Sequence, residues 1–208
     1  MASALILIDV QQGLDEPKYG RRNNPQAETN IAKLLEHWRN AKLPVFHVRH
    51  FSTEANSPLR PELPGAAIKE FALPAAGEKL FTKNVNSAFI GTELESELRS
   101  RGIKQIVLCG LTTDHCVSTS ARMGANLGFD VVLVSDATAT FERTGPDGKH
   151  WTADEIHSCE LASLHGEFAT VMDTAAVVSG SDMIPTLARK PGAMPVTTKV
   201  VRDLLESE

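Results

Sequence analysis

Three residues that lie far apart in the sequence, Asp9, Lys83 and Cys116, carry side chains suited to nucleophilic catalysis. A cysteine thiolate attacks carbonyl carbon atoms, a carboxylate can accept the thiol proton, and an ammonium stabilises the ionised pair. Each residue also has an ordinary structural explanation, since a free cysteine is often a small core residue. The chemistry therefore requires a fold that brings the three side chains to one place.

Cys116 lies near the expected start of a helix, in the segment TDHCVSTSARMGANLG, which Gly128 ends. Unpaired N–H groups and the dipole at a helix start favour an anion, so we expect the pKa of this thiol to be lowered. The same N–H groups could stabilise the oxyanion that forms when the thiolate attacks a carbonyl. Asp9 and Lys83 each end an expected strand, and a buried unpaired acid at such a position is costly.

The elements that must position these residues alternate between aliphatic strands and amphipathic helices. The expected strands are 4–10, 44–51, 78–83, 104–110, 130–136 and 167–173. The expected helices are 24–42, 92–101, 113–128 and 152–166, the second and last of them opened by the capping boxes Thr92–Glu95 and Thr152–Glu155.

Strands that are apolar throughout and separated by helices predict an α/β fold with a mostly parallel six-stranded sheet. Ligands of such sheets bind beyond the carboxyl ends of the strands. Asp9, Lys83 and the segment after Gly110 all lie at those ends, so we expect them to meet at one edge.

Composition and charge set the broad class of the protein. The 208 residues are 42% hydrophobic and 23% charged, which fits one domain, 1–208, with 179–208 as a C-terminal extension that carries a short helix near 199–205. A net charge of −5 gives no basic surface for nucleic acid, and no apolar window is long enough to span a membrane. The short N-terminal apolar run lacks a basic region, and three cysteines without CxxC spacing suit a reducing compartment, so a cytoplasmic location is expected.

Three blocks of the sequence together resemble the isochorismatase-like cysteine hydrolases, a group that includes nicotinamidases, N-carbamoylsarcosine amidohydrolase and ureidoacrylate amidohydrolase. The blocks are ALILIDVQ, TKNVNSAFIGTELESELRSRGIKQIVLCGLTTDHCVSTSARMGANLGFDVVLVSDATAT and IHSCELASLHGEFATV. Their order and spacing agree with the family from about residue 4 to residue 178. The resemblance implies a three-layer α/β/α, Rossmann-like fold and a catalytic triad of Asp9, Lys83 and Cys116.

The resemblance also implies a cis peptide bond between Leu111 and Thr112, with the N–H groups of Thr112 and Cys116 forming the oxyanion hole. The implied reaction is hydrolysis of a C–N bond in a small amide or carbamoyl substrate through a thioester, which needs no cofactor. Because the family commonly forms dimers or tetramers, a homodimer or homotetramer is expected. Two alternatives stay open: an isochorismatase-type vinyl ether hydrolase, whose protonation chemistry does not need the cysteine, and a catalytically silent binding protein.

The metal-binding nicotinamidases of this family carry an Asp-x-His signature after the second strand. Here the corresponding stretch, HVRHF, has His47 and His50 but lacks the acid, and the two histidines point to opposite faces of a strand. We therefore expect no metal, a hydrogen-bonded strand histidine at His47 and a rim residue at His50. Substrate contacts are expected from loops; the candidates are Gln11, Phe51, Arg60, Phe89 and Trp151.

Overall fold

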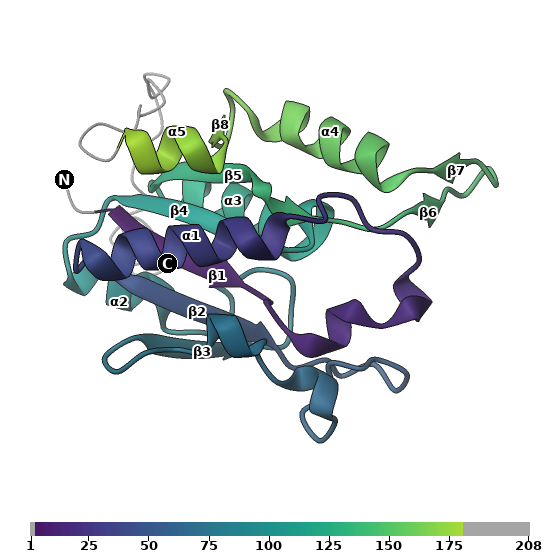
Figure 1. Ribbon diagram of the computed structural model, residues 1–208, viewed down its shortest axis with the longest axis horizontal. Helices are drawn as coiled ribbons and strands as arrows, with labels where there is room; N and C mark the ends of the chain where they lie inside the picture. Colours follow the sequence, from purple (N-terminus) through teal and green to yellow (C-terminus); the bar gives the residue numbers. More distant parts are fainter. Residues whose placement is uncertain (1–2, 181–208) are drawn as a thin grey trace, which may run out of the picture.

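The computed structural model describes residues 3–180, which form three layers with a sheet between two layers of helices (Figure 1). Six parallel strands form the sheet in the order β3-β2-β1-β4-β5-β8. The strands are β1 (Ser3–Ile8), β2 (Val45–His50), β3 (Lys79–Lys83), β4 (Gln105–Leu111), β5 (Asp130–Ala139) and β8 (Thr170–Met172). The predicted six-stranded parallel α/β fold is confirmed.

Helices cover both faces of this sheet (Figure 1). Helices α1 (Ala27–Asn40) and α5 (Thr174–Ser179) pack on one face, and α2 (Leu94–Ser100), α3 (Ser118–Asn126) and α4 (Ala153–Leu164) contribute to the core on the other. Within residues 3–180, none of the helices has both the length and the apolar character that crossing a membrane requires.

Short elements complete the description. They are the 3-10 helices η1 (Gln12–Asp15), η2 (Pro17–Tyr19), η3 (Pro64–Ala66) and η4 (Glu70–Ala72), the π-helical turn η5 (Thr113–Val117), and the hairpin of β6 (Arg143–Thr144) and β7 (His150–Trp151).

Strand β1 shows why the central strands are aliphatic throughout. Its side chains alternate between the two faces, so that Leu5 and Leu7 join the core under α1, whereas Ile6 and Ile8 join the core under α2 and α3. All six residues of β1 are buried. A parallel strand that is covered on both faces leaves no side open to water, and therefore has no polar alternation.

The helix boundaries agree with the sequence in part. The predicted capping box of Thr152 and Glu155 is confirmed, and it opens α4. The predicted box at Thr92 is wrong, because α2 begins only at Leu94 with Glu93 as its N-cap, and the Thr92 hydroxyl accepts from the Leu94 N–H and donates to the carbonyl of Ala88. Ser179 is the last residue of α5. Residues 181–208, with the predicted final helix near 199–205, lie outside the described residues, so the predicted extension stays a prediction.

Gly110 allows β4 to approach β1 closely at the end of the sheet that carries the site. Its φ is +118°, and a Cβ atom built on it would clash with the carbonyl oxygen of Ile8. Asp9 directly follows Ile8, and the turn that contains Cys116 directly follows β4. The close approach of these two strands therefore places an acid and a thiol side by side.

A polar network joins α1 to the neighbouring strands. Glu78 accepts hydrogen bonds from Arg39 (2.8 and 2.9 Å), from the Ala75 backbone (2.8 Å) and from Nε2 of His47 (2.7 Å). Burial lowers the pKa of His47 although Glu78 opposes this, so a neutral ring donates the bond. His47 is thus the buried, hydrogen-bonded strand histidine that the sequence predicted. For Glu78, burial raises the pKa, but these hydrogen bonds outweigh burial and lower the pKa to about 2.

Replacing Glu78 by glutamine is expected to destabilise the protein by about 2 kcal/mol near neutral pH, a figure that allows for solvent screening on the partly exposed Arg39 side. Because the folded-state pKa is depressed, this stabilisation is present above the ordinary value of 4.5 and is lost as the pH falls toward 2. Urea unfolding should therefore show a larger difference between variant and wild type near neutral pH than near about pH 3. A difference that stays constant with pH would contradict this origin; Glu95→Gln, on an exposed helix pair, is the control.

Candidate active site

Asp9 and Lys83 meet although two strands carry them from distant parts of the chain. Strand β2 separates β1 from β3 in the sheet; Asp9 directly follows β1 and Lys83 is the last residue of β3, so both lie at the carboxyl ends of parallel strands. Nζ of Lys83 donates a 2.7 Å hydrogen bond to Oδ2 of Asp9. Asp9 is 2% exposed and Lys83 is 1% exposed, and buried charges of this kind persist only when paired.

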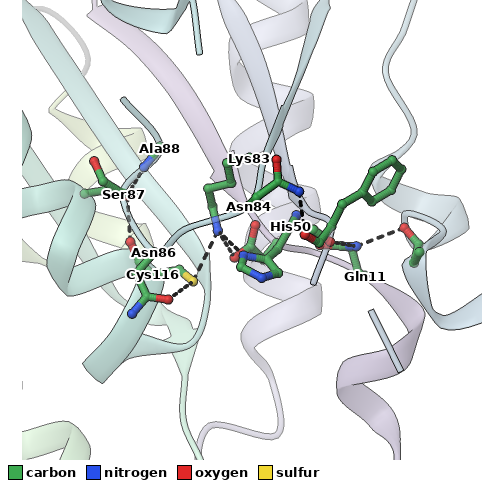
Figure 2. A network of polar contacts seen from close by, with 12 residues as sticks. Gln11, His50, Lys83, Asn84, Asn86, Ser87, Ala88 and Cys116 are labelled. Atoms are coloured by element: carbon green, nitrogen blue, oxygen red, sulfur yellow. Dashed lines mark hydrogen bonds and ion pairs between the residues drawn. The ribbon is translucent and has the colours of Figure 1, made fainter. Parts of the chain in front are cut away.

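Cys116 completes the group from the π-helical turn η5. Nζ of Lys83 donates to its Sγ at 3.2 Å (Figure 2). Ligand atoms of Asp9 and Cys116 lie within 4.8 Å of each other, and Oδ1 of Asp9 is buried with no hydrogen-bond partner in the described part of the chain. The three residues predicted to be catalytic are therefore in one cluster, with a free carboxylate oxygen beside the thiol.

The expected lowering of the Cys116 pKa is wrong. Burial raises the pKa of this thiol and the charge of Asp9 raises it further, whereas Lys83 acts in the opposite direction. The physical reason is that the closed surroundings of the thiol and the negative charge beside it outweigh the nearby ammonium. The resting residue is therefore a neutral thiol that needs a base to become a nucleophile, and Asp9 is the acid placed to act as one.

The turn before Cys116 is held by several hydrogen bonds. The peptide bond between Leu111 and Thr112 is cis, and the Thr112 carbonyl accepts 3.2 Å hydrogen bonds from the N–H groups of His115 and Val117. In the same turn, the Thr113 hydroxyl lies 2.9 Å from Nδ1 of the buried His157. A turn held in this way fixes the backbone around Cys116. The oxyanion hole assigned to the N–H groups of Thr112 and Cys116 remains a prediction.

Two further side chains touch the cluster, and of these the sequence predicted His50 only as a rim residue. Nδ1 of His50 lies 3.1 Å from Nζ of Lys83, and Oδ1 of the exposed Asn86 lies 3.7 Å from Sγ of Cys116 (Figure 2). The position of His50 could have been predicted from the alternation of side chains along β2. His50 lies two residues after Val48, which faces the core with α2 and α3, so it points to the same face, and parallel pairing places it opposite Lys83. Asn86 lies in a loop, where no periodicity indicates direction.

Asp9, His50 and Cys116 offer three potential metal-ligand atoms that all lie within 4.8 Å of one another. The Lys83 ammonium is within hydrogen-bond distance of each of the three side chains. A divalent cation at this position would have to displace a buried ammonium. The donor set therefore fits the lysine better than it fits a metal ion.

Two of the predicted substrate contacts have structural roles. Gln11 is 0% exposed: its Nε2 donates to the carbonyls of Ala66 (2.9 Å) and His50 (3.0 Å), and its Oε1 accepts from the His50 N–H (2.7 Å). All of its polar atoms are thus committed to backbone. Phe89 is buried in the core, where its ring stacks on Phe129 at 5.9 Å. The structure therefore does not present either side chain to a substrate.

The other three candidates are Phe51, Arg60 and Trp151, and they lie in different parts of the chain. Phe51 directly follows His50, and its ring lies 4.2 Å from the Arg49 guanidinium. Arg60 pairs with Glu62 and donates to the Ala55 carbonyl within its own loop. Trp151 lies on β7, in the hairpin that projects beyond the sheet (Figure 1). Of these, Phe51 remains the candidate nearest to the cluster along the chain.

Replacing Phe89 by leucine separates a core role from a substrate contact. We expect a loss of about 1 kcal/mol in unfolding free energy, because the stacked ring is lost while most of the apolar volume stays. The KM for the best substrate should stay within about 2-fold of wild type. Urea unfolding and steady-state kinetics on the same preparation measure both. A raised KM with unchanged stability would return Phe89 to the substrate site.

Comparison with known proteins adds family information to this geometry. Residues 3–176 match the family model described as Isochorismatase domain. The isochorismatase family protein YrdC of Bacillus subtilis is 46% identical over 88% of this chain and 97% of its own length. Nicotinamidase 3 of Arabidopsis thaliana is 28% identical over 82% of this chain and 84% of its own length. Ureidoacrylate amidohydrolase RutB of Rhizobium rhizogenes is 33% identical, over 58% of this chain and 50% of its own.

Solved structures with a similar fold include members of the same family. A protein of the isochorismatase family from Chromobacterium violaceum has a TM-score of 0.84 and 43% identity, and covers 88% of this chain and 95% of its own. A cysteine hydrolase from Pseudomonas syringae has a TM-score of 0.78 and 25% identity, over 86% of this chain and 91% of its own. Sequence and structure comparisons therefore agree on the fold and on the family.

Proposed function

The chain belongs to the isochorismatase family of hydrolases, and from this premise we propose that it cleaves a C–N bond of a small amide or carbamoyl substrate through a thioester on Cys116. The observation that carries the proposal is the contact of one buried ammonium, on Lys83, with both the Asp9 carboxylate and the Cys116 sulfur. Similarity to a nicotinamidase and to an ureidoacrylate amidohydrolase supports a C–N bond as the target.

The first half of the proposed reaction forms the thioester. Asp9 accepts the proton of the Cys116 thiol as Sγ attacks the substrate carbonyl carbon, and Lys83 stabilises the charges on both groups. The N–H groups of Thr112 and Cys116 donate to the oxygen of the tetrahedral intermediate. The C–N bond then breaks, and Asp9 returns the proton to the leaving nitrogen, which departs as ammonia or an amine.

The second half releases the product. A water molecule takes the place of the leaving amine, Asp9 accepts its proton, and its oxygen attacks the thioester carbon. The C–S bond breaks, Asp9 returns the proton to Sγ, and the carboxylic or carbamic acid leaves. The buried carboxylate thus acts as base and then acid in each half, which agrees with a resting thiol whose pKa burial raises.

An ammonia-release screen tests the proposal directly. Nicotinamide, ureido acids, carbamoyl amino acids, maleamate and biuret cover the amide and carbamoyl classes. We expect at least one of them to release ammonia with wild-type protein and none to do so with Cys116→Ser.

The two alternatives give distinct results in the same assay series. Pyruvate release from isochorismate that survives in Cys116→Ser would indicate a vinyl ether hydrolase, because that reaction proceeds by protonation and needs no sulfur nucleophile. Binding of a screened compound without turnover of any would indicate a catalytically silent protein. Either result would overturn the proposal.

A further inference from the structure

The Lys83 ammonium has three hydrogen-bond donors and no acceptor. It is 1% exposed, so its donors must be satisfied mainly by protein groups. One donor points to Asp9 at 2.7 Å. The other two point to Cys116 (3.2 Å) and to Nδ1 of His50 (3.1 Å) (Figure 2). Since an ammonium cannot accept, Nδ1 of His50 must be the acceptor and must carry no proton.

We propose that His50 is a positioning residue: its neutral ring, protonated on Nε2 alone, accepts a hydrogen bond from Lys83 through Nδ1 and holds the ammonium against Asp9 and Cys116. The inference rests on the proposed cysteine-hydrolase function and extends it. His50 acts through Lys83, and the catalytic steps themselves stay with the carboxylate and the sulfur.

The surrounding backbone fixes the ring in this orientation. The Gln11 amide accepts from the His50 N–H and donates to the His50 carbonyl, which ties the end of β2 to the segment after β1. His50 and Lys83 are register partners in the parallel pair of β2 and β3. A backbone contact at Val85 acts in the opposite direction to burial and raises the pKa of the ring. Because Nδ1 faces the Lys83 ammonium, Nε2 is the nitrogen left to carry the proton of the neutral ring.

Four titratable groups face the ring: Lys83 from β3, Asp9 after β1, Cys116 from η5 and Glu54 from the loop after β2. Burial lowers the pKa of His50 and Lys83 lowers it further, whereas Asp9 and Glu54 raise it, with a net lowering from 6.5. The ring is therefore neutral near neutral pH. Protonation at lower pH would remove the acceptor and place a second cation beside the ammonium.

The tautomer can be read without any substrate, by ¹⁵N NMR of histidine-labelled protein with the His50 signals assigned from His50→Asn. We expect a neutral ring with the proton on Nε2 near neutral pH and a titration midpoint below 6.5. A proton on Nδ1, or a midpoint at or above 6.5, would overturn the proposal. This readout does not depend on the hydrolase reaction, so it separates failure of this inference from failure of the proposed function.

Kinetics of two variants then test the role of the acceptor. Asparagine keeps an acceptor at a similar reach but cannot titrate, whereas leucine keeps bulk and removes the acceptor. We expect His50→Leu to lower kcat about 10- to 100-fold with KM changed less than about 3-fold, and His50→Asn to keep kcat within about 5-fold of wild type. The acid limb of the kcat/KM profile should move to lower pH in His50→Asn.

Equal kcat values for the two variants, or an acid limb that is the same in His50→Asn and wild type, would overturn the positioning role. Urea unfolding of both variants provides the control for folding. If Cys116→Ser keeps full activity, the proposed function is wrong. The NMR measurement of the tautomer uses no substrate, so its result would still test the role of His50.

Discussion

Replacing Cys116 by alanine is expected to lower kcat/KM for the best substrate by at least about 10⁴-fold, because no thioester can form without the sulfur. The loss should appear in kcat, since the sulfur forms a bond in the transition state and contributes little to binding the substrate. Steady-state ammonia release, with enough enzyme to detect slow turnover, measures the effect.

The chain provides a matched control for this variant. Cys159 is exposed on α4, and Cys159→Ala should leave kcat/KM within about 2-fold of wild type. Cys116→Ala also removes one acceptor of the buried Lys83 ammonium, so we expect a loss of about 1 kcal/mol in unfolding free energy, and urea unfolding identifies the conditions under which the variant is folded. Activity that survives in Cys116→Ala would show that the sulfur is not the nucleophile.

Replacing Asp9 by asparagine is expected to lower kcat about 10³-fold, within the range for loss of a general base. Asparagine keeps the shape of the side chain but cannot take the thiol proton, and burial keeps that thiol protonated at rest. The variant also leaves the buried Lys83 ammonium without its counterion, so a loss of stability of about 3 kcal/mol is expected from the broken pair.

Two measurements separate these effects. Kinetics at a temperature where urea unfolding shows the variant to be folded isolate the catalytic loss, and Asp154→Asn, an acid in the first turn of α4, controls for a general change in charge. The double variant Asp9→Asn with Cys116→Ala should be no slower than Cys116→Ala alone, because base and nucleophile act as one unit. A kcat within about 10-fold of wild type for Asp9→Asn would remove Asp9 from the proton transfers.

The fold could be predicted where burial leaves a periodic or continuous pattern. Strands β1 and β4 are wholly buried, and their aliphatic runs define them to within two residues at either end. The short β6–β7 hairpin and α5 were missed, because two-residue strands and a six-residue helix carry too little pattern to stand out. Thr92 had the spacing of a capping box, but the N-cap of α2 is Glu93, one residue later.

The meeting of Asp9, Lys83 and Cys116 could be predicted because the carboxyl ends of parallel strands share an edge. The burial and the charged neighbours of each group could not be predicted from the sequence. The sign of the Cys116 pKa shift depends on how deeply η5 packs, and that is set by contacts between distant segments. Gln11 is buried and hydrogen-bonded to two backbone segments. This role could not be predicted, because residues in loops show no periodicity that indicates where their side chains point.

Mass spectrometry of acid-quenched turnover tests the central claim most directly. With the best substrate from the screen, we predict a mass increment equal to the acyl or carbamoyl group, located on the peptide that contains Cys116 and absent from Cys116→Ala. An adduct located on any other residue, or the same adduct in Cys116→Ala, would contradict the account.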